Sequence, residues 1–556
     1  MELNVRQISS LEKVRAKDVL NQEEICQRSV LAGERFSYQL CMNTDAAKYK
    51  PLYVNANVES AFAACVQLFA VKEIYMDHPV VNDFPMEDYI TKEPGMMPDM
   101  LMPLEVMTVD RNNKSIWVRV DIPKDVAAGV YVIKIKLTFR NLGGDIACIM
   151  YKDMKINVIG AVMPEQRLIY TRWFYADCVA VTHGVEIYSE KHWELIEKYI
   201  AAAADVGVNM MLVPTHTPPL DTEIGTARPC VQLVDIEKNG EKYTFSFSKF
   251  KRYIGICKKC GIKYFEIAHM FSQWGADCAP NIMVTENGKT NYMFGWHVAA
   301  NSAEYVTFLK QYIKAISEEL VKEGISENTY FHISDEPHID NLEAYRTASE
   351  LIRPLIGKSK TFDALSNYTF YERGFVECPV TNIRFIHDEF LKHSVPNQWA
   401  YYACGGQETV TNCLMAMPSG RTRIIGFLLY KYNIKGFLHW GLNFYNACRS
   451  LYPINPYQTT SADKHFPSGD PFIVYPGNDC VYSSIRGEVL YDAIQDMNIC
   501  FALENLIGRE AVVEMIDAFA ERELRFDDYP RSREFLEGLR EKLVGKINEC
   551  IAGITG

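Results

Sequence analysis

The amino-acid sequence predicts an α/β protein: a (β/α)8 TIM-like barrel preceded by an N-terminal β-sandwich and followed by a C-terminal helical tail. Three observations favour this fold class. Short runs in which apolar and polar residues alternate fill residues 1–160, apolar runs separated by helical patterns fill residues 161–500, and residues 501–556 have a helical period and many charges. We therefore expect three domains with these bounds.

The composition is that of a globular protein whose cores are large enough to fold without disulfides. The chain has 556 residues, of which 48% are hydrophobic and 23% are charged. Its 16 cysteines have no framework spacing, which favours reduced thiols in a reducing compartment. The net charge of −12 and the isoelectric point near 5.6 argue against a nucleic-acid partner, because an acidic surface repels phosphates.

The first 20 residues, MELNVRQISSLEKVRAKDVL, mix polar and apolar side chains. They contain no apolar run of the length that a signal sequence or a membrane span requires. We therefore expect a cytoplasmic protein without a membrane span, or a secreted one if a leader has been removed. The oligomeric state is left open by the sequence.

Three segments of the N-terminal region have the clearest strand pattern. They are PLYVNANVES from residue 51, KSIWVRVDIP at residues 114–123 and GVYVIKIKLTF at residues 129–139. In each, β-branched and aromatic residues alternate with polar ones, which is typical of strands with one buried face. The connection KDVAAG is short and ends in glycine, so it predicts an antiparallel hairpin between the last two strands. Short strands at this spacing suggest a β-sandwich.

Helical patterns alternate with apolar runs in the central region. The segment SEKHWELIEKYIAAAADVG, with Ser189 as a candidate N-cap and Gly207 at its end, precedes the apolar run VNMMLVP. An open sheet would be expected to carry a glycine-rich phosphate loop after its first strand, and none is present there, so a closed barrel is favoured. The eight expected strands lie at residues 167–174, 208–214, 262–271, 329–337, 361–367, 382–390, 399–405 and 436–443.

Polar and aromatic side chains gather where these strands end. In a barrel of this kind, the C-terminal ends of the strands carry the active site. A rim of carboxylates with Trp, Tyr, His and Asn suits a sugar, because aromatic faces cover its apolar patches and polar side chains meet its hydroxyls. The candidate catalytic residues are Asp335 and Glu336, and the candidate substrate-binding residues are Trp173, His269, Trp274, Tyr401, Tyr402, Trp440, Asn443 and Tyr445.

The segment HISDEP places Asp335 and Glu336 side by side at the end of the fourth predicted strand. Neighbouring residues of a strand point to opposite faces, but at a strand end before proline both can turn into the same opening. Two carboxylates this close cannot both ionise cheaply, so one pKa should rise, and a protonated carboxyl can act as general acid toward a glycosidic oxygen. The alternative is a polar loop in which Ser334 or Asp335 caps the next helix.

Adjacent carboxylates are poorly placed to lie on opposite sides of a scissile bond, as the usual retaining and inverting mechanisms require. Substrate-assisted catalysis fits better: the 2-acetamido oxygen of the substrate is the nucleophile, Glu336 protonates the leaving group, and Asp335 orients and polarises the acetamido N–H. We expect no metal or other cofactor. Three histidines, at positions 216, 269 and 338, could converge on Asp335, but the sequence has no HxH or HExxH motif.

Several segments together resemble glycoside hydrolase family 123: HISDEP, IKGFLHWGLNFY, GDPFIVYPG, SSIRGEVLYDAIQDMN and the earlier WVRVDIPKDVAAGVYVIKI. This resemblance implies a β-N-acetylgalactosaminidase-like enzyme that releases terminal β-linked N-acetylgalactosamine from glycoconjugate glycans by substrate-assisted, retaining catalysis. It matches Glu336 to the acid/base and Asp335 to the aspartate that stabilises the acetamido group. In that reading, Trp440 is a wall of the sugar pocket, and Tyr401 or Tyr402 bonds the acetamido oxygen.

Two other classes of function stay open. A β-N-acetylglucosaminidase, or another exo-glycosidase on the same scaffold, would share the barrel and differ in the groups that meet the sugar hydroxyls. A non-catalytic carbohydrate-binding protein would keep the aromatic rim without turnover. The Glu336→Gln substitution separates the classes, because a binding protein would tolerate it and a hydrolase would lose turnover.

Overall fold

The computed structural model describes residues 2–45, 50–81 and 88–555. The chain divides into two compact units. The first comprises the chain up to Arg167, Gln407–Lys431 and the chain from Tyr482 onward, and the second comprises Leu168–Gly406 and Tyr432–Val481.

The first unit contains two β-sheets. One sheet has the order β1 (Leu3–Ser9), β3 (Arg35–Thr44), β8 (Lys114–Asp121), β5 (Val66–Met76), β6 (Gly95–Pro103) and β24 (Val481–Ser484). The other has the order β2 (Gln27–Ala32), β10 (Ile146–Val162), β9 (Gly129–Arg140), β4 (Leu52–Glu59) and β7 (Met107–Val109). Most neighbouring strands run antiparallel, and β2 pairs with β10 in parallel.

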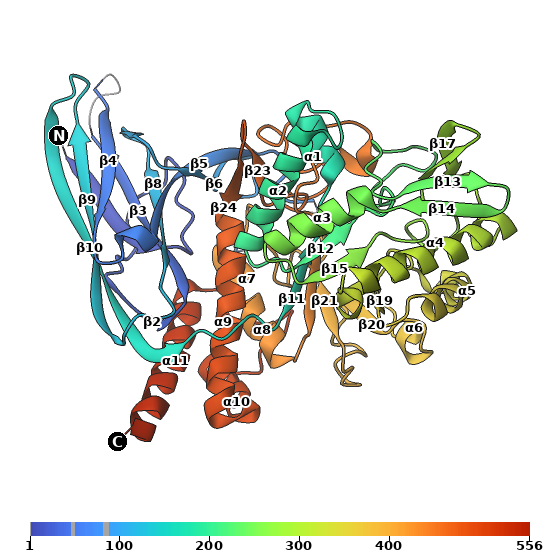
Figure 1. The fold of residues 1–556 in the computed structure, drawn as a ribbon. Coiled ribbons are helices and arrows are strands. Elements are labelled where there is room, and N and C mark those ends of the chain that lie inside the picture. The colour runs from blue at the N-terminus through green and yellow to red at the C-terminus, as the bar shows by residue number, and fades with distance from the viewer. Residues whose placement is uncertain (1, 46–49, 82–87, 556) are drawn as a thin grey trace. The chain divides into compact units, whose positions relative to one another are not determined.

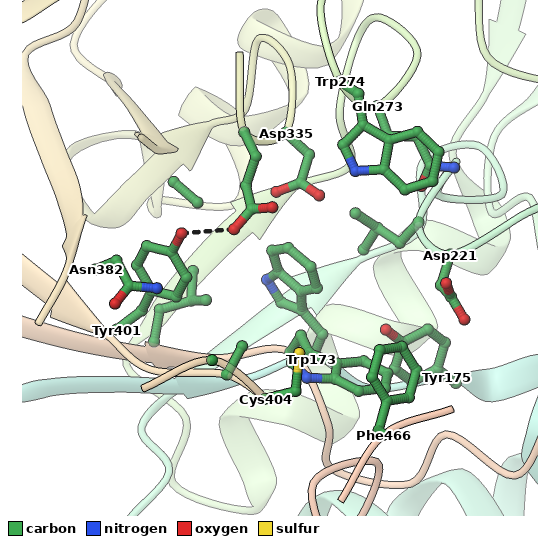
Figure 2. A pocket seen from close by; sticks show the side chains of 17 residues that line it. Trp173, Tyr175, Asp221, Gln273, Trp274, Asp335, Asn382, Tyr401, Cys404 and Phe466 are labelled. Atoms are coloured by element: carbon green, nitrogen blue, oxygen red, sulfur yellow. Dashed lines mark hydrogen bonds between the residues drawn. The ribbon is translucent and has the colours of Figure 1, made fainter. Parts of the chain in front are cut away.

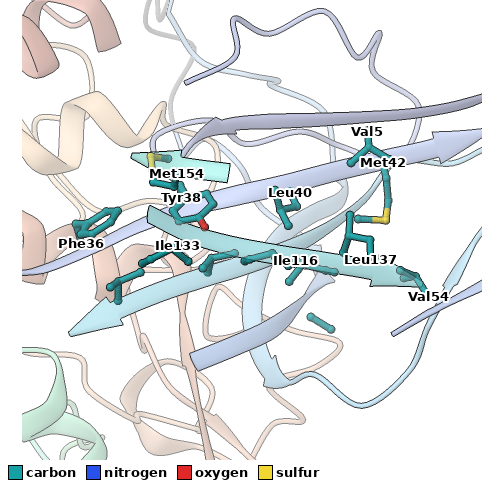
Figure 3. Close-up of a cluster of buried hydrophobic side chains, with 14 of the residues drawn as sticks. Val5, Phe36, Tyr38, Leu40, Met42, Val54, Ile116, Ile133, Leu137 and Met154 are labelled. Atoms are coloured by element: carbon teal, nitrogen blue, oxygen red, sulfur yellow. The ribbon is translucent and has the colours of Figure 1, made fainter. Parts of the chain in front are cut away.

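The two sheets bury one shared core. Alternate residues of β8, among them Ile116 and Val118, pack with Ile133 and Leu137 of β9. Figure 3 shows part of this cluster, in which side chains of β3, β8 and β9 meet between the strands. Truncating one such side chain to alanine would cost about 2–5 kcal/mol, because it removes buried apolar area and leaves a cavity. The N-terminal region is therefore sheet-rich, as predicted.

The predicted hairpin between residues 114–123 and 129–139 is wrong. Strand β8 pairs with β3 and β5, whereas β9 pairs with β4 and β10 of the other sheet. The connection between them therefore crosses from one sheet to the other. The physical reason is that each strand has one strongly apolar face, and both faces turn to the same core when the strands lie in opposite sheets.

Helices complete the first unit. Arg423 lies on α7 (Ser419–Arg423) and forms a buried ion pair of 2.7 Å with Asp496 of α9 (Ile485–Ile507). Gly426 of α8 (Ile425–Lys431) lies so close to α9 that a Cβ would stand 1.8 Å from the carbonyl oxygen of Ala493. The chain continues through α10 (Arg509–Ala520) and α11 (Arg533–Thr555), so the predicted C-terminal region is helical. No helix in the described part of the chain combines the length and apolar character that crossing a bilayer requires.

The second unit is built on a closed barrel of eight parallel strands. In order around the barrel these are β11 (Ile169–Arg172), β12 (Met210–Val213), β15 (Tyr264–Ile267), β18 (Thr329–Phe331), β19 (Lys360–Ala364), β20 (Cys378–Asn382), β21 (Trp399–Tyr401) and β22 (Gly436–His439). Strand β22 pairs with β11 and closes the barrel. This is the TIM-like arrangement that the alternation of helices and apolar runs predicted.

Helices on the outside of the barrel join its strands (Figure 1). Their apolar stripes produce this placement, and their starts follow the sequence signals: Ser189 caps α2 (Glu190–Asp205) through the N–H of His192, and Ser302 caps α4 (Ala303–Lys322) through the N–H of Tyr305. The other helices are α1 (Ala176–His183), α3 (Ser248–Lys259), α5 (Leu342–Ile352) and α6 (Thr369–Glu372). A small sheet comprises β13 (Asp235–Asn239), β14 (Lys242–Ser246), β16 (Ile282–Glu286) and β17 (Lys289–Phe294).

Seven of the eight predicted barrel strands include most of an observed strand, and the strand predicted at residues 382–390 is misplaced, because it shares only Asn382 with the observed one. The observed strand, Cys378–Asn382, ends where the predicted one begins, and the residues that follow form turns. The short segment contains Pro379, which hid its strand character, while the apolar residues after Asn382 belong to a partly buried loop. Asn382 is therefore the last residue of the observed strand, at the end of the barrel that carries the cavity, and not the first.

Candidate active site

A cavity of about 300 Å³ lies at the C-terminal ends of the barrel strands. The side chains around it come from residues that follow the strands: Trp173 comes directly after β11, Trp440 comes directly after β22, and Asp335 and Glu336 belong to the loop after β18. Asn382 and Tyr401 are the last residues of β20 and β21. The cavity therefore lies where a TIM-like barrel places its chemistry.

The chain turns sharply at the two adjacent carboxylates. Glu336 has a φ of 42°, in the left-handed region, which costs a non-glycine residue on the order of 1 kcal/mol or more. Two backbone hydrogen bonds hold the turn: the N–H of Glu336 donates to the carbonyl of Ala364 at 3.1 Å, and the N–H of Trp274 donates to the carbonyl of Asp335 at 2.8 Å. The turn breaks the alternation of the strand, so both side chains line one cavity.

A buried ion cluster lies beside this turn. The carboxylate of Asp363 accepts hydrogen bonds from the N–H of Ile333 at 3.0 Å and from the hydroxyl of Tyr345 at 2.5 Å. It also meets Nδ1 of His332 at 3.0 Å, while Nε2 of the same ring meets Glu266 at 3.2 Å. Burial alone would lower the pKa of His332, but the two carboxylates raise it to about 9. His332 is therefore an imidazolium at neutral pH. Through its contacts with His332 and Ile333, Asp363 holds the segment that leads to Asp335 and Glu336.

The cavity raises the pKa of Asp335. Burial raises the pKa of Asp335 well above its usual range, and the neighbouring Glu336 carboxylate raises it further. The charge of His332 acts in the opposite direction and is too weak to reverse the shift. The surroundings of Asp335 therefore favour its protonated form.

Tyr401 controls the orientation of Glu336. Its hydroxyl donates a hydrogen bond of 2.5 Å to Oε1 of Glu336, marked by the dashed line in Figure 2. Burial, and then the Glu336 charge, raise the pKa of Tyr401 well above its usual range, so the phenol stays a donor. The neighbouring Tyr402 lies outside the cavity lining, with its ring edge-on to His439 at 5.4 Å. In the described structure, the Tyr401 hydroxyl is thus engaged by Glu336.

Three tryptophans line the cavity. Trp173 is buried, and its ring meets His269 edge-on at 5.4 Å. Trp440 is fixed by a hydrogen bond of 2.8 Å from its indole N–H to Asp470. Trp274 is 43% exposed and has a φ of 63°. The flat apolar rings can cover the C–H faces of a sugar.

The other predicted substrate-binding residues lie behind the lining. His269 stacks on His332 with 3.8 Å between ring centres, and burial lowers its pKa well below the usual value, so it is neutral. The amide of Asn443 bonds the backbone N–H and carbonyl of Tyr175 at 2.9 and 3.0 Å. The hydroxyl of Tyr445 donates to the carbonyl of Val474 at 2.8 Å. These side chains support the walls of the cavity.

One group in the described part of the chain has ligand atoms close enough for a metal ion: His269, His332 and Asp363, within 4.8 Å of one another. The ring nitrogens of His332 both face carboxylates, and its pKa of about 9 keeps both protonated at neutral pH. A protonated imidazole has no lone pair to offer, so the donor set suits a structural ion cluster better than a metal.

The lining residues that sequence reasoning missed include Tyr175, Asp221 and Asn382. Tyr175 lies three residues beyond the end of β11, and Asp221 lies in the long loop after β12, so neither directly follows its strand. Asn382 was missed because its strand was placed too late in the sequence. A correctly placed sixth strand would have found Asn382, whereas no local signal marks Asp221.

The acidic pair, the aromatic walls and the strand ends of a parallel barrel define a site of the glycoside-hydrolase type. The chain belongs to glycoside hydrolase family 123, because the model of the glycoside hydrolase 123 catalytic domain matches residues 173–503. This confirms the family that the sequence segments resemble. No curated protein matches the chain.

One solved structure shares the fold over almost its whole length. A family 123 glycoside hydrolase from Clostridium perfringens, whose structural analysis concerned glycolipid glycan hydrolysis, has a TM-score of 0.75 and 16% sequence identity, covering 100% of this chain and 98% of its own. A family 2 glycosyl hydrolase from Bacteroides cellulosilyticus DSM 14838 has a TM-score of 0.28 and 8% identity, covering 82% of this chain and 49% of its own. The first similarity extends over both units of the chain.

Proposed function

We propose that this hydrolase removes a terminal β-linked N-acetylgalactosamine from a glycoconjugate glycan by substrate-assisted, retaining catalysis. The observation that carries the proposal is the turn at Glu336, which brings consecutive carboxyl groups into one cavity. Consecutive residues cannot straddle a glycosidic bond as a general acid and a separate nucleophile do. A nucleophile supplied by the substrate removes that requirement.

The first step forms one bond and breaks another. The acetamido oxygen of the substrate attacks the anomeric carbon, the bond from that carbon to the leaving oxygen breaks, and Glu336 gives its proton to the leaving oxygen. Asp335 accepts a hydrogen bond from the acetamido N–H and stabilises the positive charge of the oxazolinium ring that forms. The raised pKa of Asp335 supports this step, because it shows that the cavity favours a protonated carboxyl group beside the scissile bond.

The second step returns the enzyme to its starting state. Water attacks the anomeric carbon, gives a proton to Glu336 and opens the ring, which leaves the acetamido group intact and the sugar in the β configuration. The hydrogen bond from Tyr401 to Oε1 holds the Glu336 side chain in place for this proton transfer.

The size of the cavity supports recognition of a terminal sugar. A volume of about 300 Å³ is at the small end of ligand pockets and suits one sugar ring better than an extended chain. The similar Clostridium perfringens structure was analysed for glycolipid glycan hydrolysis, which supports a glycoconjugate as the substrate class here.

Hydrolysis of chromogenic β-glycosides tests the proposal. We expect cleavage of the N-acetylgalactosaminide, with weaker cleavage of the N-acetylglucosaminide and none of the galactoside. Glu336→Gln should lower kcat by several orders of magnitude while leaving sugar binding intact. Preference for the N-acetylglucosaminide would reassign the substrate, and a Glu336→Gln protein with unchanged turnover would contradict the mechanism.

A further inference from the structure

Asp221 lies on a cavity wall away from Tyr401 and Asn382, as Figure 2 shows. It belongs to the loop after β12 and has a φ of 39°, in the left-handed region. The loop of Arg449 and Ser450 holds it: the N–H of Arg449 donates to the Asp221 carboxylate at 2.9 Å, and the Ser450 hydroxyl donates to its backbone carbonyl at 2.7 Å. The carboxyl group is therefore fixed in place before any ligand binds.

The nearby guanidinium groups are taken by other carboxylates. Arg228 pairs with Asp177 at 2.7 Å in a fully buried bridge, and Arg449 pairs through its side chain with Glu223 at 3.0 Å. Burial raises the pKa of Asp221 to about 6, and the hydrogen bond from Arg449 only partly offsets this effect. Keeping a partly desolvated carboxylate at this wall costs stability, which is typical of functional sites.

Tyr175 lines the same wall of the cavity. Its side chain is buried, and among the described residues its hydroxyl has no hydrogen-bond partner. The guanidinium of Arg228 lies over its ring at 5.2 Å and holds the ring in position. A buried hydroxyl without a partner costs free energy unless a ligand completes its bonding. Asp221 and Tyr175 thus present an acceptor and an unused donor to one ligand.

We propose that Asp221 and Tyr175 bind the 4-hydroxyl and an adjacent hydroxyl of the sugar, on the side of the ring remote from the glycosidic bond. They would thereby select sugars by their configuration at C4. This inference rests on the proposed function, which places the anomeric carbon at Glu336. In a pyranose ring, C4 lies opposite C1, so a ring anchored at the dyad directs its 4-hydroxyl to a different wall. The 4-hydroxyl can donate to the Asp221 carboxylate while it accepts from the Tyr175 hydroxyl.

The arrangement has a consequence for specificity. A sugar with the opposite configuration at C4 directs that hydroxyl elsewhere, so the half-buried Asp221 carboxylate and the buried Tyr175 hydroxyl both lose this partner. Sites built to bond a hydroxyl discriminate strongly for this reason. The same geometry requires an unsubstituted 4-hydroxyl, so Asp221 and Tyr175 would restrict the enzyme to terminal sugars.

The test compares an N-acetylgalactosaminide with its 4-deoxy analogue in wild type, Asp221→Asn and Tyr175→Phe. Asparagine tolerates the left-handed backbone and keeps an acceptor for the N–H of Arg449, and phenylalanine removes only the hydroxyl, so both variants should fold. We expect wild type to lose about 100-fold or more in kcat/KM on the 4-deoxy substrate. In Asp221→Asn this penalty should shrink to less than about tenfold, mainly through a raised KM for the parent sugar.

Asp235→Asn is the matched control, because Asp235 is exposed, pairs with Lys249 and does not line the cavity. This variant should lose as much kcat/KM on the 4-deoxy substrate as wild type does. Calorimetric binding of free N-acetylgalactosamine and its 4-deoxy analogue repeats the comparison without turnover. If Asp221→Asn and Tyr175→Phe both lose as much kcat/KM on the 4-deoxy substrate as wild type does, the inference is wrong and the proposed function is unaffected. A wild type that neither cleaves nor binds the parent sugars contradicts both.

Discussion

Tyr401 and Glu336 come from different barrel strands, and the Tyr401 hydroxyl donates a hydrogen bond of 2.5 Å to Oε1 of Glu336. Tyr401 thereby fixes the position of the Glu336 carboxyl, the proposed acid/base, before substrate arrives. In the proposed mechanism, this donor pre-organises the group that releases and recovers a proton, which limits the reorganisation required during the reaction.

The Tyr401→Phe substitution should lower kcat by about 10- to 100-fold with a smaller change in KM, because Glu336 loses the donor that orients it. Tyr402→Phe is the matched control: this ring packs outside the lining, so turnover should change less than about threefold. Steady-state kinetics of both variants on one chromogenic substrate provide the comparison. Equal losses in the two variants would remove Tyr401 from the mechanism.

Asp363→Asn should destabilise the fold by about 3–5 kcal/mol, because it leaves the His332 imidazolium with one carboxylate in a buried site. Urea unfolding measures this cost. Tyr345→Phe, which removes one hydrogen bond to the same carboxylate, should cost only about 1 kcal/mol. Similar costs for the two variants would show that the charge of Asp363 is unimportant.

The same cluster predicts a pH dependence of stability. The folded-state pKa of His332, about 9, lies above its unfolded value, so its contribution is fully present below about pH 6.5 and is lost as the pH rises through 9. The stability difference between wild type and Asp363→Asn should therefore shrink between these values. A difference that stays constant from pH 6 to 9 would argue against a protonated His332.

Asp221→Asn should be more stable than wild type at pH 7, by on the order of 2 kcal/mol. The folded protein holds the Asp221 proton up to a pKa of about 6, so wild type loses stability as the pH rises from about 4 through 6. Asparagine does not titrate, and the gain should vanish below pH 4. Unfolding at pH 4 and pH 7 measures it, and a variant less stable than wild type at pH 7 would contradict the stated cost of this carboxylate.

Activity should fall at alkaline pH as the dyad loses its proton. Because burial and Glu336 raise the pKa of Asp335 well above its usual range, kcat/KM should persist through neutrality before it declines. Asp335→Asn removes one carboxylate, so the alkaline limb should move to lower pH and kcat should fall by about 100- to 1,000-fold. Asp340→Asn, an exposed control, should reproduce the wild-type profile. If the alkaline limb of the kcat/KM profile does not move in Asp335→Asn, a group other than Asp335 determines its position.

Much of the barrel could be predicted because its strands are buried on both faces and therefore appear as continuous apolar runs. The exception, Cys378–Asn382, is short and contains proline, while an apolar loop follows it and imitates a strand. The predicted hairpin between β8 and β9 is wrong for a different reason. Local spacing indicates that two strands are consecutive, but whether they pair or face each other depends on the shared core.

Some residues of the candidate site could likewise be predicted from the sequence, and others could not. Asp335 and Glu336 could be found because a carboxylate pair at the end of an apolar run is locally unusual. Asp221 could not, since the loop of Arg449 and Ser450, more than 200 residues away in the sequence, positions it. The support roles of His269 and Asn443 were also hidden, because sequence position shows that a residue lies near a strand end and does not show which way its side chain points.

The most direct measurement is the rate of hydrolysis of N-acetylgalactosaminides whose acetamido methyl group carries none, one, two or three fluorine atoms. Fluorine withdraws electron density from the acetamido oxygen and weakens it as a nucleophile. If that oxygen attacks the anomeric carbon, kcat should fall steeply with each fluorine, by orders of magnitude over the series. A rate that is nearly independent of fluorination would show that the protein supplies the nucleophile and would contradict the roles assigned to Asp335 and Glu336.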